Sequence, residues 1–107
     1  EEAIKEYEKG DYLASALISG RVIIYALGQI PGESDEEKVK FLREKGIIEK
    51  DRKDVHESII KASRRARNFF SHNIKVFPTP SEALSLLGDA IGILGIVSKV
   101  LKGEEKS

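Results

Sequence analysis

Apolar residues recur at intervals of three and four along most of the chain, and this is the period of an amphipathic helix. The pattern predicts helices over about 1–9, 12–29, 34–45, 51–72 and 80–101, and no segment has a convincing strand pattern. We therefore predict an all-α protein, an antiparallel bundle of four or five helices, with one domain over residues 1–107.

Helix-start and helix-stop residues separate these segments. Asp11 is placed to cap the second helix. Residues 34–37 (SDEE) and 79–82 (TPSE) both have the spacing of a capping box, in which a hydroxyl and a carboxylate bond free amides at a helix start. Gly46 stands where a helix ends in a left-handed residue. The charged tail after residue 101 is expected to fray.

The helical period also predicts which side chains form the core. In the second helix the predicted stripe is Leu13, Ala16, Leu17, Gly20, Ile24 and Leu27. Its apolar arc is widened by Ile18, Val22, Ile23 and Tyr25, so we expect this helix to be covered on more than one side. In the fourth helix the predicted stripe is Val55, Ile59, Ala62, Ala66, Phe69 and Phe70. The last helix contains Gly88, Gly92 and Gly95, each at a cost of about 1 kcal/mol relative to alanine. Two explanations stay open for these glycines: close helix packing within the chain, or a helix shared across a dimer interface.

Charge and composition narrow the range of functions. The 107 residues include 18 basic and 18 acidic side chains, so any attraction to nucleic acid must come from local clustering. Cysteine is absent, which excludes disulfides and thiolate metal sites. The absence of Met and Trp, with few side-chain amides, favours a thermophilic source.

Location is predicted from two segments. The N-terminal segment lacks the pattern of a secretory signal, and we expect a cytoplasmic protein. The stretch 83–101 approaches the length of a membrane span, but Asp89 inside it favours a buried bundle helix and no membrane partner.

The most unusual stretch is RRARNFFSHN, residues 64–73. On an ideal helix Arg65, Asn68 and His72 share one polar stripe beside the core face, while Arg64 and Arg67 lie on the other flank. No acidic residue occurs from position 61 to 75, which predicts a local phosphate-binding patch. The residues expected to hold RNA phosphates are Lys61, Arg64 and Arg65.

These residue types suit metal-independent cleavage of RNA. Arginine binds a phosphate through two parallel hydrogen bonds, and histidine transfers protons near neutral pH. Asn68, four residues before His72, can orient the imidazole or bind a phosphate oxygen. No metal site and no cofactor is predicted. The alternative is that the arginines and His72 only interact with the helix dipole at a helix end. His56 is too far along the helix to join this site and is predicted to be a surface histidine.

Residues 67–72, Arg-Asn-Phe-Phe-Ser-His, resemble the Arg-polar-x-x-x-His motif of the HEPN superfamily (higher eukaryotes and prokaryotes nucleotide-binding domain). The order of segments is also similar: an early helix YLASALISGRVIIYAL, a short helix, a KGII turn, the motif helix and an apolar last helix. The resemblance implies an all-α homodimer with the motif copies facing across a cleft. Active members are metal-independent endoribonucleases, many of them in toxin–antitoxin or defence systems.

By this resemblance Arg67 and His72 would form the catalytic pair, supported by Asn68. The 2′-hydroxyl would attack the adjacent phosphate and leave a 2′,3′-cyclic end. The partners implied are RNA, a second copy, and a cognate antitoxin or nucleotidyltransferase protein. Family toxins that such a transferase modifies often have His-x-Tyr, and Ile74 stands at the Tyr position here, which argues against that route.

Two alternatives to catalysis remain. In the first, the chain is a non-catalytic dimerisation or partner-binding module in which Arg67 bonds a carbonyl or an acidic side chain. In the second, the cleft binds a nucleotide or another small ligand.

Overall fold

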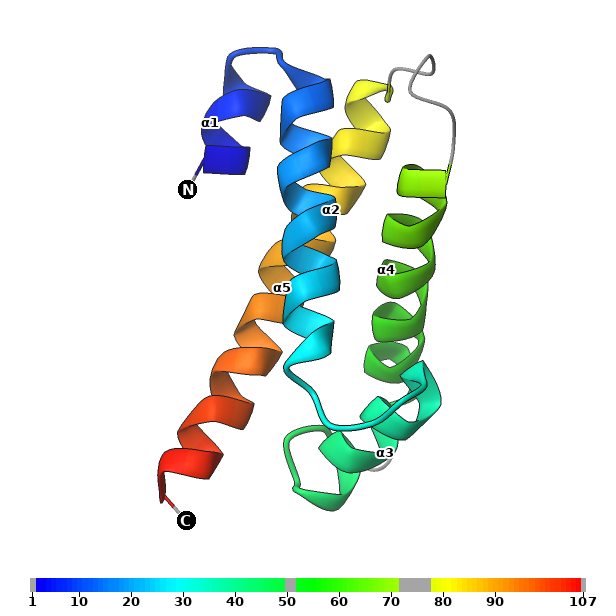
Figure 1. Ribbon diagram of the computed structural model, residues 1–107, viewed down its shortest axis with the longest axis vertical. Helices are drawn as coiled ribbons and strands as arrows, with labels where there is room; N and C mark the ends of the chain where they lie inside the picture. The colour runs from blue at the N-terminus through cyan, green and yellow to red at the C-terminus, as the bar shows by residue number, and fades with distance from the viewer. Residues whose placement is uncertain (1, 50–51, 72–77, 107) are drawn as a thin grey trace.

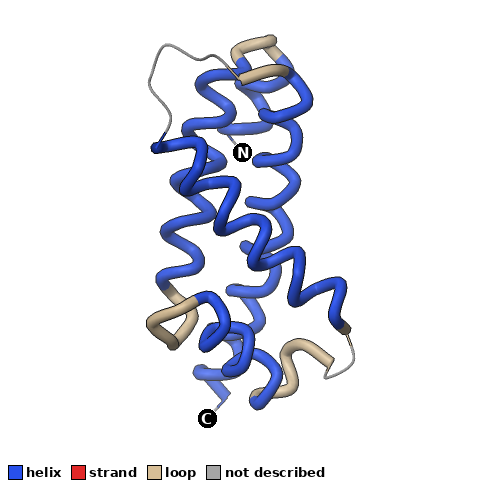
Figure 2. The backbone as a smooth tube through the Cα atoms, turned by 90° about the vertical axis from the view of Figure 1, so that its right-hand side faces the viewer, coloured by secondary structure: helices blue, strands red, loops and turns tan. Residues whose placement is uncertain are grey.

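A computed structural model describes residues 2–49, 52–71 and 78–106, with side chains up to residue 102. Every regular element in these ranges is a helix (Figure 2), which confirms the all-α prediction. The helices are α1 (Glu2–Glu8), α2 (Tyr12–Gly28), α3 (Asp35–Glu44), α4 (Lys53–Ser71) and α5 (Pro80–Lys106). His72, Asn73 and Ile74 lie outside the described residues.

Helix α2 is the centre of the bundle. It packs against α5, α1 and α4, while α3 packs against α4. In Figure 1, α2 and α5 cross each other and run in the same general direction, while α4 lies beside α2 and runs in the opposite direction. The contacts between α4 and α5 are sparser than those between α2 and α5, so the space between α4 and α5 is incompletely filled. The largest fully buried side chains of the core are Ile23, Leu42, Ile59, Leu86 and Val39.

The predicted helix starts are confirmed by their hydrogen bonds. The Asp11 carboxylate accepts from the Ala14 amide at 3.0 Å. In the first capping box the Ser34 hydroxyl accepts from an amide at 3.2 Å, and in the second the Thr79 hydroxyl does the same at 3.2 Å. These bonds satisfy amides that have no partner inside the helix, so each helix begins where its cap stands.

The turn after α3 brings two apolar residues into the core. Gly46 adopts φ +72°, a conformation that costs an L-residue energy and that glycine adopts freely. The Ile47 amide then bonds back to the Leu42 carbonyl at 2.9 Å, which closes the helix end. Ile48 is buried as a result, and Ile47 is half-buried.

The buried face of α2 differs from the predicted stripe. Ile24 is 46% exposed, while Ile23 is fully buried. The centre of the buried face also includes Ser15 and Ser19, which a hydrophobic pattern counts as polar. Ser15 is accommodated because its hydroxyl donates to the Ala3 carbonyl of α1 at 2.9 Å. The contact with α1, as well as the apolar side chains of α2, therefore determines which face of α2 is buried.

Helix α5 is longer than predicted. It continues to Lys106 instead of ending near residue 101, because Lys and Glu are good helix formers and no proline stops it. By length and composition α5 qualifies as a candidate membrane span over Pro80–Lys102, and in this structure it packs against α1, α2 and α4.

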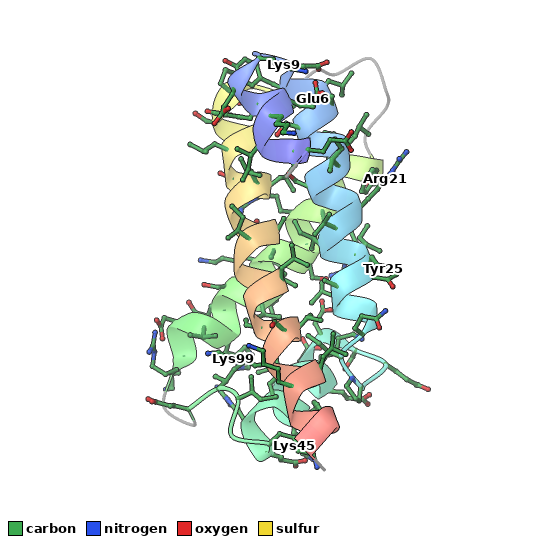
Figure 3. The ribbon with its side chains drawn as sticks, turned by 90° about the vertical axis from the view of Figure 1, so that its left-hand side faces the viewer. Glu6, Lys9, Arg21, Tyr25, Lys45 and Lys99 are labelled. Carbon is green, nitrogen blue, oxygen red and sulfur yellow. The ribbon has the colours of Figure 1, made fainter. Side chains whose placement is uncertain are left out.

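The glycines of α5 do not serve close packing within the chain. Apart from the nearby backbone of α5 itself, a Cβ atom built on Gly88, Gly92 or Gly95 would meet no atom of the described residues within 4 Å. The first of the two explanations is therefore wrong, and the shared dimer helix stays a prediction. Ile91 and Leu94 on α5 are exposed, and so is Tyr25 on α2, which projects outward in Figure 3.

Candidate functional site

Four of the predicted site residues line one cavity between α4 and α5. The cavity has a volume of about 460 Å³. Helix α4 contributes Lys61, Arg64, Arg65, Asn68 and Phe69. The other side of the cavity is formed by Pro78, two residues before α5, and by Ser81, Glu82, Ser85 and Leu86 in the N-terminal part of α5. The polar groups lie around a floor that includes the half-buried Phe69 and the buried Leu86 and Pro78.

The arrangement of the basic residues on α4 differs from the prediction in one respect. Arg64 was expected on the flank opposite Arg65, yet both line the cavity together with Asn68. Positions 61, 64, 65 and 68 are three or four residues apart and share one broad face of the helix. Long arginine side chains widen that face, so two residues about 100° apart on the helix reach the same cavity.

The side chains of Lys61 and Arg64 have no hydrogen bond or ion pair to any group within the ranges 2–49, 52–71 and 78–102, and both residues are exposed. The side-chain amide of Asn68 is likewise without a hydrogen-bond partner among those residues. These groups are donors that face the cavity and remain available to a ligand.

Arg67 points away from the cavity and joins α4 to α3. Its Nη2 donates to Oδ2 of Asp35 at 3.1 Å, and its Nε donates to the Ser63 carbonyl at 3.4 Å. The Ser63 hydroxyl donates to the other Asp35 oxygen at 3.1 Å. Asp35 is the first residue of α3, and its side chain is 17% exposed. This is the internal pairing that the non-catalytic alternative expects of Arg67.

Arg65 lines the cavity and is paired with Asp89 of α5. Its guanidinium donates to the Asp89 carboxylate, whose side chain is 21% exposed. Burial raises the pKa of the Asp89 carboxyl, while the nearby Arg65 charge lowers it to a smaller extent. Asp89 also borders a second cavity of about 310 Å³ between the same two helices, which Gly88 and Gly92 leave open.

The structure therefore brings together Lys61, Arg64, Arg65 and Asn68, and it separates Arg67 from them. The relation of Arg67 to His72 lies outside the described residues. Sequence reasoning missed the α5 side of the cavity, although Ser81 in the second capping box and Ser85 have one-turn spacing. His56 is half-buried near the start of α4, where a surface position was predicted.

No group of three or more His, Cys, Asp or Glu side chains suited to a metal occurs in the part of the chain that the structure describes.

No family model, no curated protein and no solved structure matches this chain. The function is therefore argued from the site alone.

Proposed function

We propose that this chain is an RNA-binding helical domain whose α4–α5 cavity holds a backbone phosphate. The observation that supports this proposal is the pair of cations, Lys61 and Arg64, that line the cavity without an ion pair among the described residues. Unpaired cations around a concave site provide the electrostatic contribution that dominates nucleic-acid affinity. Asn68 adds a neutral donor and acceptor beside them.

The floor of the cavity favours a nucleotide unit over a bare inorganic anion. Phe69 offers an aromatic surface, and Pro78 and Leu86 extend the apolar area. Base stacking on aromatic side chains contributes about 1–3 kcal/mol per base in single-strand binding proteins. The Ser81 and Ser85 hydroxyls on the α5 side suit the sugar and phosphate oxygens of the same nucleotide.

The salt dependence of binding tests this proposal. Each phosphate contact to a single strand contributes about 0.7 to the slope of log K against log salt concentration. Because the cavity holds one backbone phosphate, we expect it to contribute about 0.7 to the magnitude of this slope. The double variant K61A/R64A is expected to lose most of that contribution. The measurement is fluorescence anisotropy of a labelled 12-nucleotide single-stranded RNA from about 50 to 200 mM salt.

The matched control is K99A/K102A. It removes the same number of charges from the exposed distal half of α5, where Lys99 is labelled in Figure 3. This control is expected to retain the wild-type slope. An equal loss of affinity in both double variants would mean that binding depends on overall charge and not on the cavity.

Metal-independent cleavage of the bound RNA is the second candidate. It is favoured by the place of Asn68, the polar member of the HEPN-like motif, at the cavity that also contains Arg64. In this proposal His72 transfers the proton of the attacking 2′-hydroxyl, and an arginine stabilises the charge of the phosphorane. Because Arg67 is paired with Asp35, we place binding ahead of cleavage.

Cleavage is tested by incubating the protein with total RNA in EDTA, beside the variants His72→Ala and Arg67→Ala. Wild-type fragments with 2′,3′-cyclic ends that both variants fail to produce would establish the ribonuclease. Intact RNA in every tube, with RNA binding retained, would leave the non-catalytic RNA-binding domain as the function. HEPN membership, a homodimer and a cognate protein partner remain part of this proposal, and the mass of the protein in solution tests the dimer.

A further inference from the structure

Asp89 contacts the candidate phosphate site through Arg65. Its carboxylate accepts from the Arg65 guanidinium, and that arginine lines the first cavity. Asp89 is the only acidic residue between positions 83 and 101, the most apolar stretch of the chain. Its side chain is mostly buried and borders the second α4–α5 cavity. The positive charge that Arg65 offers to an anionic ligand is therefore partly neutralised by the Asp89 carboxylate.

The charges at the site can be counted. Lys61, Arg64 and Arg65 are the cations, and Glu82 and Asp89 are the carboxylates, which leaves one net positive charge. Glu82 also takes part in the capping box at the start of α5, where it accepts from the Thr79 hydroxyl at 3.3 Å. Asp89 has no such role at a helix end, and among the described residues its charged partner is Arg65.

We infer, on the basis of the proposed phosphate-binding function, that Asp89 determines the charge of the ligand that the cavity accepts. A singly charged phosphodiester neutralises the site. A phosphomonoester carries close to two negative charges above its second pKa of about 6, so it leaves one charge uncompensated in a partly buried cavity. Asp89 therefore favours internal phosphodiester linkages of RNA over terminal phosphomonoesters and free mononucleotides.

The other groups that face Asp89 do not change this reasoning. On the α4 side, the second cavity is lined by Val55, Ser58, Ile59 and Ala62, none of which carries a charge. On α5 its neighbours at this cavity are Gly88, Gly92, Ile93 and Ile96. Removing the Asp89 charge thus changes the potential at Arg65 without disturbing a second ion pair among the described residues.

The test compares 3′,5′-cyclic AMP with 5′-AMP at pH 7.5, because these two ligands share a base and differ mainly in the charge of the phosphate. Binding is followed by two-dimensional ¹H–¹⁵N NMR, in which an unchanged pattern of backbone signals also shows that each variant is folded. Asp89→Asn keeps an oxygen that accepts from Arg65 and removes the charge. The Asp89→Asn variant is expected to increase the affinity for cyclic AMP about fivefold and the affinity for AMP about twenty-five-fold. The second factor is the square of the first because the repulsion between Asp89 and the ligand is proportional to the ligand's charge, which is about twice as large for AMP.

One further variant, Asp89→Glu, retains the carboxylate charge and should keep the wild-type ratio of the two affinities. If Asp89→Asn changes both affinities by the same factor, or changes neither, the inference is overturned while RNA binding at the cavity still stands. If wild-type protein binds neither nucleotide and no RNA, the proposed function itself is wrong.

Discussion

The pairing of Arg67 with Asp35 predicts a stability effect that separates a structural role of Arg67 from a catalytic one. Arg67→Ala removes the guanidinium that joins α4 to the first residue of α3. Asp35→Ala removes the shared acceptor, together with the hydrogen bond from Ser63. The double variant completes a thermodynamic cycle, in which the coupling between the two side chains is measured directly.

The magnitude follows from the exposure of each partner. The Arg67 side chain is 63% exposed, and ion pairs of that kind contribute about 0.2–1 kcal/mol. Asp35 additionally gains about 0.3–1 kcal/mol from the helix dipole of α3 and about 1 kcal/mol from the Ser63 hydroxyl. We expect a loss of about 0.5–1 kcal/mol for Arg67→Ala and about 1.5–2.5 kcal/mol for Asp35→Ala, with a coupling of about 0.5–1 kcal/mol.

Urea and thermal unfolding of the four proteins provide the measurement, and a loss of 1 kcal/mol corresponds to about 4 °C in Tm at this chain length. Arg64→Ala is the control, since it removes the same side chain from the same helix without breaking an ion pair among the described residues. A coupling of zero would refute the structural role of Arg67. Loss of RNA cleavage in Arg67→Ala with unchanged stability would instead support the catalytic role.

Two further predictions concern α5. Because burial raises the folded-state pKa of Asp89 above its unfolded value, protonated Asp89 contributes stability that is lost as the pH rises through the folded pKa. Urea unfolding of Asp89→Asn is therefore expected to show a stability advantage over wild type that grows from about pH 3 to pH 7, and a constant difference would contradict this. A Cβ on Gly92 meets open space, so Gly92→Ala is expected to stabilise the protein by up to about 1 kcal/mol in thermal unfolding. If light scattering shows a dimer that Gly92→Ala dissociates, a second copy covers this face and the gain should disappear.

The local structure of this protein was predictable from short stretches of sequence. The cap at Ser34, the cap at Thr79 and the left-handed Gly46 depend on groups within three or four residues of each other. Such interactions are already determined by backbone geometry at a helix end, and they do not depend on the rest of the fold. The same is true of Arg65 and Asn68, which are three residues apart and lie together on any helix, whereas Arg64 was expected on the opposite flank and lines the same cavity.

The partners of the site residues were decided by the tertiary structure. Arg67 meets Asp35 from 32 positions away, and Arg65 meets Asp89 from 24 positions away. Asp35 and Asp89 are both visible in the sequence, but the sequence does not show which arginine of α4 each one contacts. That pairing depends on how α3 and α5 pack against α4. The sequence alone thus indicated four or five helices, several of their caps and a cluster of cations. The tertiary structure determined that Arg65 forms an ion pair with Asp89 of α5 and that Arg67 forms one with Asp35 of α3. It also determined that Lys61 and Arg64 line the cavity without an ion pair among the described residues.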